Sequence, residues 1–171
     1  ETIYTVNADF IADVASIIFE EATNYHYLDD MPDYCQLVIG TADMEDAYQQ
    51  FPQCPKSRGI NVVGWYSEKH QGWRFATAWG LVFGKRRAVV QFNRLSTLVV
   101  ASSRLITIVP STAFFDDFMT VDFELPGNSA QQTLTAMVHA TGASLQAKKT
   151  MPPLTQRPFL GVYVRLDVML T

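Results

Sequence analysis

Two adjacent aspartates, Asp116 and Asp117, lie between two runs of apolar and aromatic residues at 105–115 and 118–125. The pattern predicts a tight β-hairpin with the acidic pair at its tip. Two carboxylates about 4 Å apart repel each other by roughly 4 kcal/mol at an intermediate effective dielectric. Such a pair is costly unless water or a cation compensates it. The dipeptide therefore indicates either a solvated turn or a metal site.

The composition predicts one ordered globular domain. The chain has 171 residues, of which 48% are hydrophobic and 18% charged, typical of a folded protein with a sizeable core. The most apolar stretch, 88–110, contains Asn93, Arg94 and Arg104, so no membrane span is expected there. Cys35 and Cys54 show neither metal-site nor disulfide spacing. We read them as free thiols and expect an intracellular location, in cytoplasm or nucleus.

Charge is distributed unevenly along the chain. Residues 1–50 contain eleven acidic residues and no Lys or Arg, whereas residues 51–171 contain six acidic and thirteen basic residues. An acidic segment binds phosphate poorly, and the basic remainder is suited to it. The formal net charge of −4 neither proves nor excludes a nucleic-acid partner.

The periodicity of apolar residues predicts alternating helices and strands around the hairpin. Mixed order of this kind favours an α+β fold of the split-βαβ (ferredoxin-like) type, in which an antiparallel sheet packs on helices. The predicted helices are 9–22, a short one at 44–51, 85–103, and one from Ser129 to near Gly142; the predicted strands are 35–43, 60–66, 73–78, 105–115, 118–125, 145–149 and 159–170, with a turn at Pro152-Pro153.

A third carboxylate, Asp43, ends the predicted strand 35–43. In a split-βαβ sheet the first strand and the hairpin can be neighbours, which would bring Asp43 to Asp116 and Asp117. Oxygen-rich clusters of this kind attract hard divalent cations such as Mg²⁺. Two ions about 4 Å apart can activate an attacking 3′ hydroxyl and stabilise a leaving pyrophosphate. The carboxylates therefore predict two-metal phosphoryl transfer.

Five segments between residues 42 and 162 match, in order, the motifs of one protein family. The chain resembles the palm domain of a reverse transcriptase, an RNA-directed DNA polymerase of the retroelement type. The segments are 42–52, similar to D-x-x-D-A-[YF]-x-x-[VIF]-P; 81–94, similar to L-P-F-G…A…F-N-R; 114–117, similar to [YF]-x-D-D; 142–149, similar to G-h-x-h-x-x-x-K with h apolar; and 159–162, similar to the F-L-G turn near the primer grip.

The resemblance implies a catalytic role for four side chains. Asp43 and Asp116 would bind two Mg²⁺ or Mn²⁺ ions, with Asp117 as a further ligand or as electrostatic support. Lys149 matches the lysine proposed to protonate the leaving pyrophosphate. Two alternatives are that Lys148 takes this role and that both lysines are simply solvated.

The resemblance also implies a nucleotide site. Tyr48 would stack under the sugar of the incoming deoxynucleotide and exclude a 2′ hydroxyl; the alternative is an ordinary core aromatic. Phe83 and Gly84 would line the pocket, with the glycine allowing close backbone approach. The whole implied site comprises Met44, Asp46, Ala47, Tyr48, Phe83 and Gly84. The carbonyl of Met44 could also bind a metal, and a structural cap is the alternative role for Asp46.

The chain departs from the family pattern at Val82, where proline is usual, and at Phe114, where tyrosine is commoner. We expect residues 1–34 to be residual fingers with a helix leading into the palm, and residues 35–171 to be the palm itself. The basic fingers residues that grip the triphosphate and the helical thumb are not recognisable. We therefore expect a fragment of a larger retroelement polyprotein, whose missing fingers and thumb are its partners together with dNTP and a primed RNA or DNA template.

Two other functions fit parts of the sequence. The first is a catalytically inactive reverse-transcriptase-like relic that acts as a structural or interaction domain; the intact set of three aspartates argues against decay. The second is another two-metal enzyme on a similar palm, such as a nucleotide cyclase. The Ala47-Tyr48 dipeptide and the segment 92–94 fit the cyclase poorly.

Overall fold

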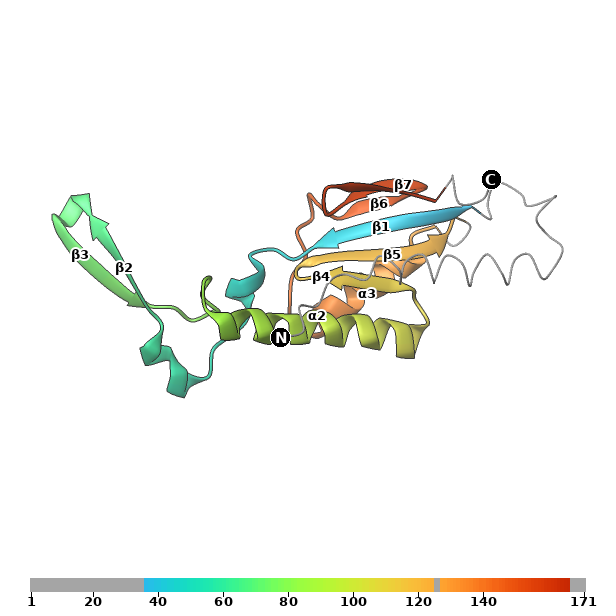
Figure 1. Cartoon of the computed structure of the whole chain (residues 1–171). Helices are drawn as coiled ribbons and strands as arrows, with labels where there is room; N and C mark the ends of the chain where they lie inside the picture. The colour runs from blue at the N-terminus through green and yellow to red at the C-terminus, as the bar shows by residue number, and fades with distance from the viewer. Residues whose placement is uncertain (1–35, 125–126, 167–171) are drawn as a thin grey trace. The chain divides into compact units, whose positions relative to one another are not determined.

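The computed structural model describes residues 36–124 and 127–166 (Figure 1). The described chain divides into two compact units: Glu45–Leu95, here called the ribbon unit, and the remaining described residues, here called the sheet unit. Each is described by itself. The predicted helix 9–22, like the whole predicted segment 1–34, lies outside the described residues. The predicted domain boundary after residue 34 stays a prediction.

The sheet unit is built on a four-stranded antiparallel sheet. Its strands are β1 (Leu37–Asp43), β4 (Ser111–Phe114), β5 (Asp117–Phe123) and β6 (Met151–Leu154), in the spatial order β4-β5-β1-β6. The helices are α2 (Arg86–Thr107), which begins in the ribbon unit, and α3 (Ser129–Ala140). Along the chain these elements run β-α-β-β-α-β, which is the split-βαβ order. The predicted fold class is confirmed.

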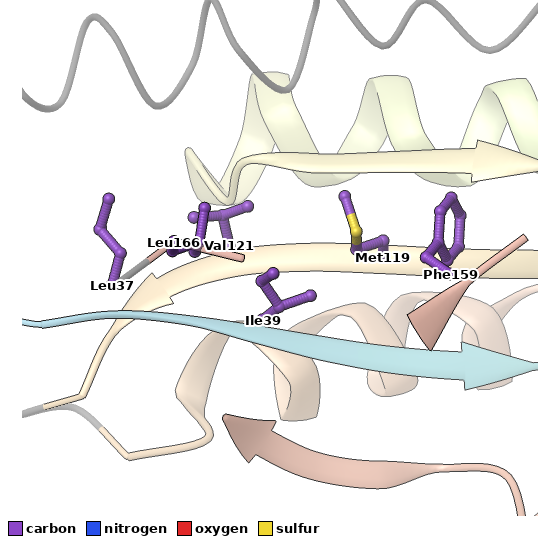
Figure 2. Close-up of a cluster of buried hydrophobic side chains, with 6 residues drawn as sticks. All are labelled: Leu37, Ile39, Met119, Val121, Phe159 and Leu166. Atoms are coloured by element: carbon purple, nitrogen blue, oxygen red, sulfur yellow. The ribbon is translucent and has the colours of Figure 1, made fainter. Parts of the chain in front are cut away.

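One face of the sheet carries a hydrophobic core (Figure 2). Leu37 and Ile39 of β1 lie opposite Phe123 and Val121 of β5 in the register. Alternation along each strand puts these side chains on one face. That face is covered by the hairpin of β7 (Gln156–Phe159) and β8 (Val162–Arg165) and the residue after it. The buried cluster comprises Leu37, Ile39, Met119, Val121, Phe159 and Leu166.

The other face of the sheet receives α3, which contacts β1 and β5. Gly40 permits this close packing, because a Cβ there would fall 2.8 Å from the Thr120 hydroxyl oxygen and 3.1 Å from Cδ of Gln131. The Gln131 side chain is buried, and its Nε2 donates to the carbonyls of Thr41 at 2.8 Å and Met151 at 2.7 Å. These carbonyls flank the irregularity in the β1–β6 register. The side-chain amide of Gln131 thus provides hydrogen bonds for two backbone carbonyls at the point where the strand pairing is irregular.

The ribbon unit contains an antiparallel pair, β2 (Val62–Ser67) and β3 (Gly72–Thr77), which confirms the predicted strand pair. Three short 3₁₀ segments accompany it: η2 (Ala47–Gln50), η3 (Pro55–Ile60) and η4 (Glu68–His70), the last at the ribbon's tip. The helical segment predicted at 44–51 is thus a single 3₁₀ turn.

Four other local predictions are wrong. Residues 159–170 were predicted as one strand, but β7 ends at Phe159, a turn follows at 160–161, and β8 covers only 162–165. Residues 105–107, predicted as strand, are the last turn of α2, where Arg104 donates two hydrogen bonds to the Ser111 carbonyl. Residues 145–149 form no strand; Leu145 makes one isolated bridge with Met44. Pro152 and Pro153 lie inside β6 rather than in a turn. Since β6 is an edge of the described sheet, missing proline N–H groups are tolerated there.

Among the described residues, no helix has the length and apolarity needed to cross a bilayer.

Candidate active site

Asp43 and Asp117 form a cross-strand pair. Asp43 is the last residue of β1 and Asp117 the first of β5, and the register places them directly opposite each other. Directly paired residues share a face and have Cβ atoms about 4.5–5.5 Å apart. By alternation they lie on the face of Leu37 and Ile39, opposite the one that contacts α3. The fold therefore brings two of the three predicted carboxylates together at one end of two neighbouring strands.

The hairpin turn before Asp117 is held from two sides. Phe114 pairs with Asp117, so Phe115 and Asp116 make the turn. Phe115 adopts a left-handed backbone with φ of 55°, which is strained for a bulky residue. The Asp116 carbonyl accepts the N–H of Met44 at 3.0 Å, and the Phe115 carbonyl accepts the hydroxyl of buried Ser96 at 2.5 Å. Sequence reasoning missed Ser96, since a serine inside a helix gives no local signal.

Lys149 lies directly on this carboxylate pair. Its Nζ is 2.8 Å from Oδ2 of Asp43; the lysine side chain is 60% exposed and the aspartate 9%. The loop that carries Lys149 is anchored nearby, because the N–H of Gln146 donates to the Asp43 carbonyl at 2.7 Å. The N–H of Lys149 then donates to the Gln146 carbonyl at 3.0 Å. The backbone thus ties the lysine to the end of β1.

The carboxylates carry more negative charge than one lysine offsets. Burial first, then the charges of Asp43 and Asp116 and a side-chain hydrogen bond with Asp43, raise the pKa of Asp117 to about 6, although Lys149 lowers it. The hydrogen bond to Asp43 and that carboxylate's charge raise the pKa of Lys149. At neutral pH, above the pKa of Asp117, the site therefore holds an ionised Asp117 carboxylate and a protonated Lys149 amine.

A hollow of about 260 Å³ adjoins the pair. Asp43, Asp117 and both lysines, Lys148 and Lys149, contribute to its wall, and Phe159 and Leu160 of the predicted F-L-G turn contribute the apolar part. The segments 114–117, 142–149 and 159–162, read from the sequence as motifs, thus meet around one cavity.

The oxygen donors at this site are few for a metal ion. In the described part of the chain, no group of three or more His, Cys, Asp or Glu side chains is arranged to hold a metal ion. The structure pairs Asp43 with Asp117, and Asp116 lies in the turn beside them. Two carboxylates still meet the needs of Mg²⁺, which takes one or two together with substrate phosphates. Metal binding by these residues stays a prediction.

The predicted sugar-contacting residue, Tyr48, lies in the ribbon unit. Its ring stacks on Phe92 with centroids 4.8 Å apart and planes 11° apart, and tilts against Phe83 at 4.6 Å. Tyr48 is buried whereas Phe83 is exposed. The Tyr48 carbonyl accepts the N–H of Leu81 at 2.9 Å, which ties the first two motifs together. Tyr48 thus packs as a buried aromatic, and its contact with a nucleotide stays a prediction.

The other predicted nucleotide residues lie around this cluster. Gly84 has φ of 83°, and a Cβ there would meet nothing within 4 Å. Glycine therefore suits this position because it adopts the left-handed backbone, and not because a described residue packs closely against it. Asp46 is left-handed with φ of 43° and precedes η2, and its side chain makes no capping bond. Its carbonyl accepts the N–H of Gln49 at 2.7 Å. Ala47 is buried.

Gly80 is a further positioning residue that sequence reasoning missed. A Cβ at this position would fall 2.4 Å from the carbonyl oxygen of Gln49. The Gly80 carbonyl accepts a hydrogen bond from the side chain of Gln53, whose own N–H donates to the Trp79 carbonyl at 2.9 Å. The segment between β3 and Phe83, which bends at 79–80, can therefore approach the Tyr48 segment only with glycine here.

No protein-family model and no curated protein sequence matches this chain. Two solved structures of the foamy viral protease-reverse transcriptase do match. One, in complex with dsDNA, has a TM-score of 0.59 at 15% identity over 76% of this chain and 26% of its own. The dRH form with dsDNA has a TM-score of 0.59 at 16% identity over 81% and 24%. The chain has a reverse-transcriptase-like fold and spans about a quarter of those chains.

Proposed function

We propose that this chain is the palm region of an RNA-directed DNA polymerase, which adds deoxynucleotides to the 3′ hydroxyl of a primer. The observation that carries the proposal is the Asp43–Asp117 cross-strand pair with Lys149 at 2.8 Å, on a reverse-transcriptase-like sheet. The fold alone supports only a nucleic-acid-related polymerase-like domain, because one fold hosts many functions. The carboxylate pair supports phosphoryl transfer as the reaction within this class of domain.

In this proposal Asp43 and Asp117, with Asp116 beside them, would hold two Mg²⁺ or Mn²⁺ ions. Such ions, when bound, neutralise phosphate charge and activate the attacking hydroxyl. Lys149 holds a proton on Nζ, since its pKa is raised by Asp43, and would donate it to the leaving pyrophosphate. Because the lysine is exposed and the aspartate is not, Lys149 can leave Asp43 without moving the sheet.

The aromatic cluster would select the sugar. The Tyr48 ring stacks on Phe92 and contacts Phe83 at a tilt, and these contacts would hold it against a 2′ hydroxyl. Met44, Asp46, Ala47 and Gly84 would complete the nucleotide site. The dsDNA in the complexes of the foamy viral proteins supports a primed template as partner.

The chain covers about a quarter of those proteins, so we also propose that fingers and thumb belong to the same retroelement polyprotein. The test is dNTP addition to a primed RNA template by a longer protein that includes the flanking segments. Asp43→Asn and Asp117→Asn should each lower the rate by at least about 100-fold, as loss of a main electrostatic group does. The exposed carboxylate of Glu68, removed by Glu68→Gln, is the matched control. Equal rates of dNTP addition in the unchanged protein and in all three variants would contradict the assignment of Asp43 and Asp117 to the active site.

The alternative is an inactive relic that keeps the fold. One observation favours it: no described group of three carboxylate, imidazole or thiolate side chains is placed for a metal. A relic would show no divalent-ion dependence in any readout, and the same longer protein would fail to extend primers with Mg²⁺ or Mn²⁺.

A further inference from the structure

The ribbon of β2 and β3 carries three aromatic rings on one face. The register sets Tyr66 opposite Trp73 and Gly64 opposite Phe75, and alternation puts all four on the same side. The rings of Tyr66 and Trp73 lie 6.0 Å apart at 81°. A Cβ on Gly64 would fall 2.9 Å from the Phe75 ring, so that ring lies over the glycine. We call Tyr66, Trp73 and Phe75 the aromatic platform.

The platform is open to solvent. Tyr66 is 51% exposed, Trp73 66% and Phe75 69%, and the ribbon that carries them is a two-stranded hairpin (Figure 1). Single exposed apolar side chains are ordinary, but three adjacent rings on one face mark a binding surface.

The charge of the ribbon unit favours a polyanion. Residues 45–95 contain eight Lys and Arg and three Asp and Glu, a balance of +5, whereas the rest of the chain contains five and fourteen, a balance of −9. Two of these cations belong to the ribbon itself and are exposed: Lys69 lies at its tip, and Arg74 lies opposite Trp65 on the face that does not carry the platform. Lys56 lies in η3, which contacts β3. Positive charge is therefore concentrated in the unit that carries the rings.

We infer that the aromatic platform binds unpaired bases of single-stranded nucleic acid. Every base has a π-face, so exposed rings bind a strand without sequence preference, while nearby cations contact its phosphates. Trp73 and Phe75 are two residues apart on β3, about 6.8 Å, about twice the 3.4 Å rise per nucleotide of a stacked strand. Neighbouring rings can thus each take a base. This binding deepens the proposed function and rests on it, since a primed template supplies unpaired bases; its test needs neither metal nor nucleotide triphosphate.

The test is fluorescence anisotropy of labelled twelve-nucleotide oligo-dT and oligo-U with the 171-residue chain. Trp73→Ala should weaken binding about 5- to 150-fold, the range for loss of one stacked base. The affinity of Trp73→Phe, which keeps a ring, should stay within about threefold of that of the unchanged chain. Trp73→Leu, which is apolar but not planar, should bind as weakly as the alanine variant. Phe75→Leu should likewise weaken binding, because it removes the second ring. Lys69→Gln should lower the slope of log K against log salt by about 1.

The matched control is Trp65→Ala. Trp65 lies opposite Arg74 on the other face of the same ribbon and is 48% exposed, so its loss should change affinity less than about twofold. Equal losses in Trp65→Ala and Trp73→Ala would overturn the assigned face. Tight binding by Trp73→Leu would overturn base stacking. A sedimentation result in which Trp73→Ala dissociates a dimer without changing oligonucleotide affinity would show that the platform binds a second copy instead.

Catalysis and platform binding are separable in this design. Asp117→Asn should leave oligonucleotide affinity within about twofold, because Asp117 belongs to the sheet unit and the platform to the ribbon unit. A duplex of the same length should compete at least about tenfold more weakly than the single strand, since its bases are already stacked. If the duplex and the single strand compete equally, phosphate contacts alone explain the binding, and the inference of base stacking is overturned.

Discussion

Lys149 contacts Asp43 at 2.8 Å, so the lysine expected to protonate a leaving group lies on the carboxylate expected to bind metal. The two roles are compatible, because the Lys149 side chain is 60% exposed and can leave the carboxylate, whereas Asp43, at 9%, is held at the end of β1. The ion pair between Lys149 and Asp43 also explains how two carboxylates can face each other in the folded chain. Lys149 offsets part of the charge of Asp43 and Asp117. The pKa of Asp117 is raised nevertheless, first by burial and then by the charges of Asp43 and Asp116.

Removing this lysine should raise the pKa of Asp117 further. Lys149 lowers that pKa through its charge, so Lys149→Gln should move the Asp117 titration midpoint above about 6. Carboxyl ¹³C NMR against pH measures the midpoint directly. Lys148→Gln is the control, since Lys148 lines the same hollow but is not a cause of the Asp117 shift. An equal effect of the two substitutions would show that general charge, and not the Lys149 contact, governs the site.

Stability should fall as pH rises through the Asp117 titration. Its pKa is raised from 3.8 to about 6 on folding, so between these values the folded state holds more protons than the unfolded state. The free energy of unfolding therefore decreases with pH in that window, and the cost is complete above about pH 6. Asp117→Asn removes this cost and should stabilise the chain at pH 7.5 by about 1 kcal/mol, allowing for solvent screening of a half-exposed group.

Urea unfolding at pH 4 and pH 7.5 checks this. The difference between Asp117→Asn and the unchanged chain should disappear at pH 4. Glu124→Gln, which removes an exposed carboxylate from the same unit, should show no such pH dependence. A variant Asp117→Asn that is less stable at pH 7.5 would contradict the prediction.

Divalent ions should stabilise the folded chain through the same carboxylates. A ligand that binds only the folded state adds about 2.7 kcal/mol at one hundred times its dissociation constant. We expect Mg²⁺ or Mn²⁺ to raise the Tm by a few degrees relative to EDTA and to lower the pKa of Asp117. Asp43→Asn should abolish both effects, whereas Glu124→Gln should keep them. A Tm rise that survives in Asp43→Asn would place the metal elsewhere or assign the effect to ionic strength.

Tyr48→Ala should relax sugar selection in the longer polymerase. Removing a ring held by Phe92 and Phe83 opens room for a 2′ hydroxyl, so the ratio of kcat/KM for dNTP over rNTP should fall at least about tenfold. The same substitution creates a core cavity that costs about 3–5 kcal/mol. Tyr48→Phe separates these effects, because it keeps the ring and should keep selectivity.

The control for sugar selection is Phe51→Leu. Phe51 touches Phe92 edge-on at 5.2 Å but was not predicted to meet the nucleotide. Its loss should change stability and leave the dNTP to rNTP ratio unchanged. If Phe51→Leu relaxes the ratio as much as Tyr48→Ala does, packing of the whole cluster, rather than the Tyr48 ring, sets selection.

Features with a local signal were predictable from the sequence. The aspartate hairpin follows from apolar alternation on both sides of a polar turn. Helix α3 ends before Gly142, whose φ of 83° is the left-handed value expected of a glycine just past the end of a helix. The opposition of Asp43 and Asp117 was within reach because the split-βαβ order makes their strands neighbours.

Features set by tertiary context were not predictable. Pro152 and Pro153 resemble a turn until the strand that holds them is known to be an edge of the described sheet. Residues 105–107 have strand-like composition, but α2 continues through them. The contact between Lys149 and Asp43 depends on a loop anchored by Gln146, and no spacing in the sequence reveals that bond.

Gly80→Ala should destabilise the ribbon unit selectively. The added Cβ would fall 2.4 Å from the Gln49 carbonyl oxygen, and the backbone can relieve this only by moving the Tyr48 segment, at about 1–3 kcal/mol. All three tryptophans of the chain lie in residues 45–95, so tryptophan fluorescence during urea unfolding reports on this unit. Gly59→Ala is the matched control, because a Cβ there meets nothing within 4 Å and should change the midpoint little. If the two variants unfold alike, the close approach at Gly80 does not hold the nucleotide segment in place.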